Sequence, residues 1–144
     1  MTWLRSYLFA PGNNEDLVSK VFDSGADAVV LDLEDAVPPA QKVRARELVA
    51  NAIDFRHSTS GPGEAPIPVT FVRINSLQSR EWREDVKACV RAGVSGIRVP
   101  KAESVEMFCR LSDAMSDRES AAGLTHGAIV VVATIESARG ARGS

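Results

Sequence analysis

The chain has 144 residues, with 17 Lys or Arg against 19 Asp or Glu, so its formal charge is −2. This near balance gives no electrostatic reason to expect a nucleic acid partner. Hydrophobic residues make up 44% and charged residues 25%, which excludes a disordered or collagen-like chain and suits one packed domain. The longest apolar run, residues 128–133, is far shorter than the roughly 20 residues of a membrane-spanning helix, so we expect no membrane association.

No basic segment followed by an apolar run marks the first residues for secretion, and a cytoplasmic location is therefore expected. Cys89 and Cys109 fall in stretches of helical periodicity without CxxC spacing, and we expect both to be reduced thiols in the core. His57 and His126 lie in segments without periodicity. A solitary loop histidine is usually solvated, so neither is assigned a role.

Short β-like runs alternate with longer helix-like runs, which is typical of an α/β fold with repeated βα units and a parallel sheet. Five runs rich in Val, Ile, Leu or Phe are expected to be strands buried on both faces. They are residues 6–10, 28–34, 69–75, 96–100 and 128–136.

Four helices are expected between these strands. The first is capped by Asn13 or Asn14 and stops at Gly25, and the second begins near Pro38 and Pro39. Segments 54–68 and 116–127 are dense in turn formers and are expected to be surface loops. The apolar stripes are Leu17, Val18, Val21 and Phe22; Ala45, Leu48, Val49, Ala52 and Ile53; Trp82, Val86, Cys89 and Val90; and Val105, Phe108, Leu111 and Met115.

Candidate reactive groups stand where the predicted strands end, because the carboxyl ends of parallel strands converge at one edge. Side chains alternate between the two faces of a strand, so residues two apart, in the pairs given below, are predicted to share a face. If the faces that carry these pairs converge, two carboxylates meet one guanidinium. A structural salt-bridge network remains an alternative. We favour a Mg²⁺ site because the surplus is acidic and carboxylates with a water shell suit this ion. The residue pairs are Asp32 and Glu34, Arg73 and Asn75, and Thr134 and Glu136.

Six segments carry motifs, in order along the chain: RSYLFAPG at 5–12, LDLEDAV at 31–37, Lys42 with Ala45 and Arg46, VRIN at 72–75, VPKAE at 99–103 and IESARG at 135–140. Together they resemble the citrate lyase β-subunit-like branch of the HpcH/HpaI aldolases, which also includes malyl-CoA lyases. The resemblance implies a (β/α)₈ barrel of the TIM type. Residues 1–144 would be its N-terminal portion, a partial barrel with about five of the eight strands.

The same resemblance implies a Mg²⁺-dependent carbon–carbon lyase. Such an enzyme cleaves a 3-hydroxyacyl-CoA, for example citryl-CoA or malyl-CoA, into acetyl-CoA or a homologue and a keto acid. Acyl-CoA and keto-acid substrates and assembly as a homo-oligomer are therefore expected. The motifs imply that the catalytic residues are Arg73 and Glu136, and that Glu136 also binds the metal. The residues that would contact substrate are Arg5, Arg73, Lys101 and Glu136. The water shell of the metal would be held by Glu34 and Asp35.

A closed barrel needs eight βα units and about 200 residues or more, and the second metal aspartate of the family is expected beyond a sixth strand. We therefore expect a truncated barrel that binds Mg²⁺ weakly by itself. Two alternatives remain open. One is a complete five-stranded flavodoxin-like sheet, which suits the length. The other is a non-catalytic truncated paralogue or association subunit.

Overall fold

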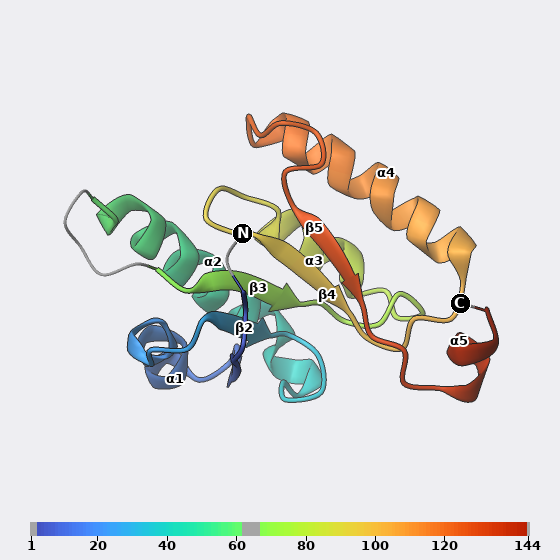
Figure 1. Ribbon diagram of the computed structural model, residues 1–144, viewed down its shortest axis with the longest axis horizontal. Coiled ribbons are helices and arrows are strands. Elements are labelled where there is room, and N and C mark those ends of the chain that lie inside the picture. Colours follow the sequence, from blue (N-terminus) through green and yellow to red (C-terminus); the bar gives the residue numbers. More distant parts are fainter. Residues whose placement is uncertain (1–2, 62–66, 144) are drawn as a thin grey trace.

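Five strands form one parallel sheet in the order β1-β2-β3-β4-β5 in the computed structural model, which describes residues 3–61 and 67–143 (Figure 1). A flavodoxin-like sheet has the order 2-1-3-4-5, so that alternative is wrong. Strands that neighbour one another in chain order are those of successive units of a (β/α) barrel. The strands are β1 (Tyr7–Pro11), β2 (Ala28–Asp32), β3 (Val69–Arg73), β4 (Gly96–Val99) and β5 (Val130–Ala133).

Helices follow the strands as predicted, and Asn14 caps the first of them by accepting a hydrogen bond from the Leu17 amide at 3.1 Å. None of the described helices combines the length and apolarity that crossing a membrane demands. The helices are α1 (Glu15–Lys20), α2 (Lys42–Thr59), α3 (Trp82–Cys89), α4 (Val105–Ala121) and α5 (Ala138–Gly143), with short 3₁₀ turns η1 (Val21–Asp23) and η2 (Pro39–Gln41).

The two faces of the sheet differ. One face packs on the helices and forms the main core, in which Val29, Leu31, Val72 and Ile97 are fully buried. We call the opposite face the inner face. Its residues follow from the strand register and the alternation of side chains: Tyr7, Phe9, Pro11, Ala28, Val30, Asp32, Val69, Phe71, Arg73, Gly96, Arg98, Val130 and Val132.

Three apolar assignments in the helices are wrong, because Leu17, Val105 and Cys109 are exposed. The expectation that all five strands are buried on both faces is also wrong for the edge strands β1 and β5, where Leu8, Phe9, Val130 and Val131 are exposed. Val105 and Cys109 are four residues apart in α4 and share the face that points away from buried Leu111. Cys89 is fully buried, and burial raises the pKa of its thiol.

Two helices run into segments predicted as loops. Helix α2 continues through His57 to Thr59, where the hydroxyls of Ser58 and Thr59 donate to the Phe55 carbonyl at 2.9 Å. Hydroxyl groups that bond the preceding turn are compatible with a helix end, so composition alone misjudged this segment. Helix α4 likewise continues to Ala121. Both histidines are exposed, as expected.

Candidate functional site

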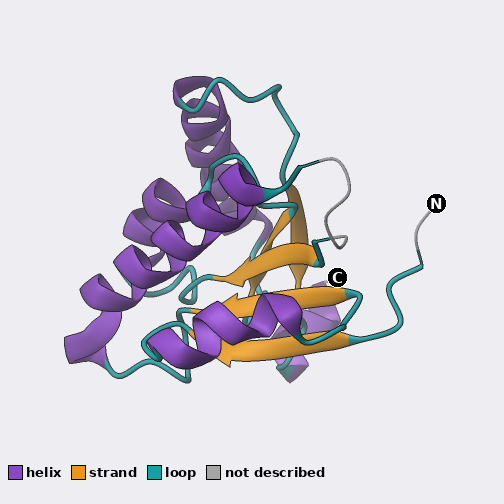
Figure 2. Cartoon of the chain, turned by 90° about the vertical axis from the view of Figure 1, so that its left-hand side faces the viewer, coloured by secondary structure: helices purple, strands orange, loops and turns teal. Residues whose placement is uncertain are grey.

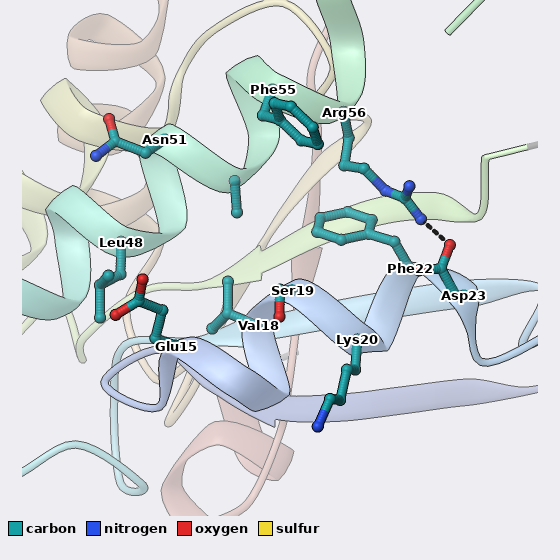
Figure 3. A pocket seen from close by; sticks show the side chains of 11 residues that line it. Glu15, Val18, Ser19, Lys20, Phe22, Asp23, Leu48, Asn51, Phe55 and Arg56 are labelled. Atoms are coloured by element: carbon teal, nitrogen blue, oxygen red, sulfur yellow. Dashed lines mark hydrogen bonds and ion pairs between the residues drawn. The ribbon is translucent and has the colours of Figure 1, made fainter. Parts of the chain in front are cut away.

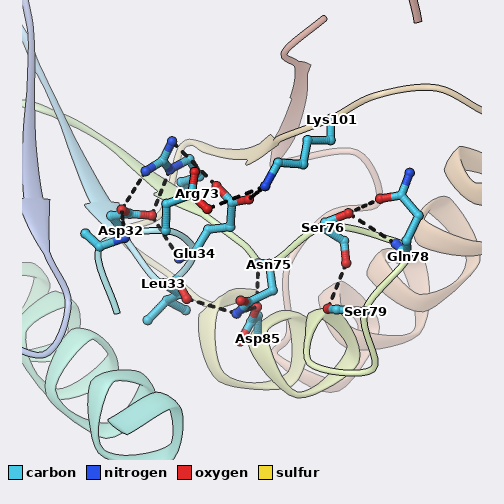
Figure 4. A network of polar contacts seen from close by, with 12 residues as sticks. Asp32, Leu33, Glu34, Arg73, Asn75, Ser76, Gln78, Ser79, Asp85 and Lys101 are labelled. Carbon is cyan, nitrogen blue, oxygen red and sulfur yellow. Dashed lines mark hydrogen bonds and ion pairs between the residues drawn. The ribbon is translucent and has the colours of Figure 1, made fainter. Parts of the chain in front are cut away.

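Asp32 and Arg73 form the centre of a polar cluster at the carboxyl edge of the sheet. They end β2 and β3 and are register partners. Arg73 Nε donates to Asp32 Oδ1 at 2.7 Å and Nη2 donates to Oδ2 at 2.6 Å, which is a bidentate ion pair (Figure 4). Asp32 is 2% exposed whereas Arg73 is partly exposed, so the carboxylate of the pair is held away from water.

The charge state of Asp32 reflects this pairing. Burial by itself would raise the pKa of the carboxyl group, but hydrogen bonds from Arg73 and from the Glu34 amide outweigh it, and the pKa lies below its ordinary value. The same hydrogen bond to Asp32 raises the pKa of Arg73. Asp32 also accepts from the amides of Glu34 at 2.9 Å and Ala36 at 3.2 Å, so it anchors the loop that follows β2.

Glu34 lies between two cations. Its Oε1 accepts from Lys101 Nζ at 2.7 Å, and its Oε2 lies 3.6 Å from Arg73 Nη1. The residue is 5% exposed, yet Oε2 is buried without a hydrogen bond. A buried carboxylate oxygen left in this way is costly, and a bound ligand would satisfy it. Asp35 is exposed, and its Oδ1 lies 3.4 Å from Lys101 Nζ.

Two carboxylates, Asp32 and Glu34, do meet the Arg73 guanidinium, although Glu34 lies two residues beyond the end of β2. The predicted convergence with the Glu136 face is not observed. We call Asp32, Glu34, Arg73 and Lys101 the inner-face cluster. Lys101 has a φ of 51°, which is uncommon for a residue with a Cβ and marks a constrained turn after β4.

The loop that carries Glu34 is fixed from the helix side. Lys42 Nζ donates to the carbonyls of Leu33 and Glu34, both at 2.6 Å, and Asn75 Nδ2 donates to Leu33 at 2.9 Å. Burial lowers the pKa of the Lys42 ammonium, although nearby acids including Asp85 oppose the shift. Sequence reasoning included Lys42 in a motif but did not find this contact. The sequence feature that could have indicated this contact is the position of Lys42, in the first turn of the helix that follows the acidic segment 31–37.

Asn75 does not share a face with Arg73, which corrects the prediction. Strand β3 ends at Arg73, so the alternation does not extend to Asn75. The Asn75 amide and Nδ2 instead donate to Asp85 Oδ2, each at 2.7 Å, and Arg46 Nε donates to Asp85 Oδ1 at 2.7 Å. Arg46 also pairs with Glu81. We call Arg46, Asn75, Glu81 and Asp85 the helix-side cluster.

Glu136 stands apart from both clusters. Strand β5 ends at Ala133, so Thr134 and Glu136 belong to the connection to α5, and the predicted shared strand face is absent there. Glu136 is exposed and makes no hydrogen bond or ion pair with the residues that the structure describes. Within residues 3–61 and 67–143, no three His, Cys, Asp or Glu side chains are grouped to hold a metal ion.

Arg5 lies at the other end of the sheet. It precedes β1 and forms an ion pair with Asp27, which precedes β2, at 2.9 Å. Figure 2 shows the strand arrowheads pointing away from the side on which the N-terminal segment approaches. The structure therefore does not bring Arg5 together with the inner-face cluster.

A cavity of about 490 Å³ lies outside the sheet, between α1 and α2 (Figure 3). Its floor includes Val18, Phe22 and Leu48, and Arg56 at its rim pairs with Asp23 and stacks on Phe22. None of the residues predicted for the site lines this cavity. It is separate from the carboxyl edge.

These features define an α/β protein of the (β/α)-barrel class, with its acids and bases at the carboxyl ends of the strands. The chain belongs to the HpcH/HpaI aldolase/citrate lyase family, whose model matches residues 5–142.

Known relatives agree with this assignment. The citrate lyase subunit beta of Leuconostoc mesenteroides subsp. cremoris is 39% identical over 136 residues, which are 94% of this chain and 43% of that protein. The Mycobacterium tuberculosis citrate lyase beta subunit complexed with oxaloacetate and magnesium is 31% identical, with a TM-score of 0.60 over 94% of this chain and 49% of that one. The chain thus spans less than half the length of these relatives.

The fold extends to a more distant protein. Haloferax volcanii malate synthase has a TM-score of 0.80 over 96% of this chain and 43% of that one, at 15% identity. At this identity the likeness shows the fold alone.

Proposed function

We propose that the chain contributes to a Mg²⁺-dependent carbon–carbon lyase that cleaves a 3-hydroxyacyl-CoA, such as citryl-CoA or malyl-CoA, into acetyl-CoA or a homologue and a keto acid. The observation that carries the proposal is Glu34. Its buried Oε2 lacks a hydrogen bond between Arg73 and Lys101 at the carboxyl edge. The Mycobacterium tuberculosis relative, described with oxaloacetate and magnesium, supports the same chemistry.

The carboxylates at this edge fit a magnesium ion. Mg²⁺ is commonly bound by one or two carboxylates, with water and substrate oxygens completing its shell, so a cage of three protein ligands is unnecessary. Glu136 is free to be a direct ligand because none of the described residues bonds to it. Glu34 and Asp35 would hold the water shell. When bound, the ion would polarise the carbonyl of the keto acid as a Lewis acid.

Arg73 would bind the substrate. Its Nε and Nη2 are engaged by Asp32, which fixes the plane of the guanidinium. Among the described residues, the Nη1 group has only the 3.6 Å contact to Glu34 Oε2, so it remains available to a substrate oxygen. A fixed, permanent cation stabilises negative charge that grows on that oxygen as the carbon–carbon bond breaks.

Lys101 has a supporting role in this proposal. Its ammonium neutralises Glu34 and Asp35 at the mouth of the site, and hydrogen bonding to Glu34 raises its pKa. It therefore stays charged through neutral pH and can attract an anionic substrate.

The test is turnover of citryl-CoA or malyl-CoA in the presence of Mg²⁺, with thioester products followed by chromatography and mass spectrometry. The assay has two arms: the chain alone, and the chain supplemented with three further βα units from a relative. We expect turnover in at least the second arm, and Arg73→Ala and Glu136→Gln should each abolish it. Glu106→Gln is the matched control, because Glu106 is an exposed acid paired with Arg110 on α4.

Absence of turnover in both arms would contradict the lyase proposal and would favour a non-catalytic association subunit. Turnover that persists in Glu136→Gln would contradict the metal-binding role of Glu136.

A further inference from the structure

Arg98 is a second arginine on the inner face beside the cluster. It lies on β4 as the register partner of Arg73 on β3, and the alternation of strand side chains directs both to the same face. The motif comparison did not include it. A strand of four residues, GIRV, with one arginine among apolar residues was the signal that could have found it.

The guanidinium of Arg98 has no hydrogen bond or ion pair with the residues that the structure describes. It lies over two aromatic rings instead, 5.4 Å from the centroid of Tyr7 and 5.9 Å from that of Phe9. The carboxylates nearest in the fold are already engaged, because Arg73 pairs with Asp32 and Lys101 with Glu34. A half-buried cation therefore stands beside the candidate site without a protein anion.

The aromatic contacts leave the hydrogen-bond donors of Arg98 free. A ring attracts the flat face of a guanidinium, whereas the five N–H groups point outward in its plane. Contact with the Tyr7 and Phe9 rings uses none of these donors in a hydrogen bond to the described residues, so they remain available. The planar fork matches a carboxylate, to which it can donate two parallel hydrogen bonds.

The guanidinium groups of Arg73 and Arg98 both lie near the ring of Phe9. The guanidinium carbon of Arg73 lies 5.4 Å from the Phe9 centroid, close to the corresponding 5.9 Å for Arg98. Two cations beside the same ring suit an anion with two separated negative groups. The floor below them is closed, because a Cβ at Gly96 would come within 2.5 Å of the Phe71 ring.

We infer that Arg98 is a specificity-determining residue that binds the distal carboxylate of a dicarboxylic 2-oxo acid. The reacting end of the same acid would lie toward Arg73. This inference rests on the proposed function and names the substrate class of that site. A 2-oxo acid without a second carboxylate would make the same contacts at its reacting end and none with Arg98.

The test compares two acids that share a reacting end. Freshly dissolved oxaloacetate and pyruvate are titrated calorimetrically into the 144-residue chain with Mg²⁺, and coenzyme A is titrated separately. We expect oxaloacetate to bind about tenfold more tightly than pyruvate. In Arg98→Met that preference should disappear, with oxaloacetate weakened about tenfold and pyruvate changed less than about twofold.

Arg83→Met is the matched control, since Arg83 also stacks on an aromatic ring, 4.4 Å from the centroid of Trp82, but is exposed on α3. It should bind both acids as the wild type does. If Arg98→Met does not fold, as judged by circular dichroism, Arg98→Lys decides the question. It keeps the charge without the planar fork and should weaken oxaloacetate alone by about threefold.

Several results would overturn the inference. Unchanged oxaloacetate binding, or equal weakening of both acids, would show that Arg98 does not read the second carboxylate. Weakened binding of coenzyme A alone would assign Arg98 to a phosphate group. If the wild type binds neither acid, the titrations are repeated with the chain supplemented by the three further βα units. Failure to bind in that arm as well would contradict the proposed function, whereas the other outcomes leave it intact.

Discussion

The inner-face cluster and the helix-side cluster each join acids to an arginine, but they differ in how fully their charges are matched. Figure 4 shows Asp85 and Asn75 of the helix-side cluster below Glu34 and Arg73 of the inner-face cluster. In the helix-side cluster Asp85 is fully buried and both of its carboxylate oxygens accept hydrogen bonds. In the inner-face cluster Glu34 is almost as buried, and its Oε2 accepts none.

This difference suggests that the helix-side cluster stabilises the fold, whereas the inner-face cluster binds a ligand. A buried charge with all partners present holds structure together, and removing one partner leaves an uncompensated charge. A buried acceptor without a partner is a cost to the fold that a ligand can recover. We therefore expect substitutions in the helix-side cluster to change stability most, and substitutions at Glu34 to change ligand binding most.

The largest effect on stability is expected for Asp85→Ala. Arg46 would lose one of its two ion pairs, and both amide groups of Asn75 would lose Asp85 as an acceptor. We expect a destabilisation of about 3–5 kcal/mol, measured by urea denaturation. The control is Glu84→Ala, because Glu84 is an exposed neighbour whose ion pair is with exposed Lys87, and exposed pairs contribute about 0.2–1 kcal/mol. Equal losses in the two variants would contradict the assignment.

Arg73→Ala is expected to have an intermediate effect on stability and a complete effect on catalysis. Asp32 would remain buried without its bidentate partner, at a cost of about 2 kcal/mol because Arg73 itself is partly solvated. Arg110→Ala removes only an exposed pair with Glu106 and serves as the control. A stable Arg73→Ala variant with normal turnover would exclude Arg73 from both roles.

The pH dependence of stability should report the same ion pair. The folded pKa of Asp32 lies below its ordinary value of 3.8, so the unfolded state binds more protons in this range. The stabilisation is then fully present above about pH 4 and is lost as the pH falls through the depressed folded pKa. Urea midpoints measured from about pH 5 down to pH 2 should fall in the wild type, and less steeply in Arg73→Ala. Parallel profiles would contradict the pairing.

Glu34→Gln is expected to change stability least, by less than about 1 kcal/mol, because it removes a carboxylate with an unsatisfied oxygen and a partly exposed Lys101 partner. Mg²⁺-dependent binding of oxaloacetate should nevertheless weaken. Glu119→Gln sharpens the contrast. Both Glu119 oxygens accept backbone hydrogen bonds, from Gly127 at 2.7 Å and Ile129 at 3.0 Å, so its loss of stability should exceed that of Glu34→Gln.

Much of the fold could be predicted from periodicity, because strands buried on both faces and helices with one apolar stripe have distinct patterns. The residues at which the strands end could not be predicted from periodicity. The predicted strand over residues 69–75 ends at Arg73, and this early end turns Asn75 toward Asp85 instead of toward the inner face.

The part of the site that lies within paired strands was predicted correctly. Alternation correctly brought Asp32 and Arg73 together because both end paired strands. Glu136 lies beyond such a constraint, and its position is set by the connection to α5. Arg98 was missed because charge alone did not distinguish an arginine with a carboxylate partner from one stacked on rings.

The most direct test of the carboxyl edge as a joint site for a divalent ion and a keto acid is calorimetric titration of oxaloacetate into the chain with Mg²⁺ and with EDTA. Binding should require Mg²⁺ and should be lost in Glu136→Gln but not in Glu106→Gln. Binding of equal strength in EDTA, or in Glu136→Gln, would contradict the account.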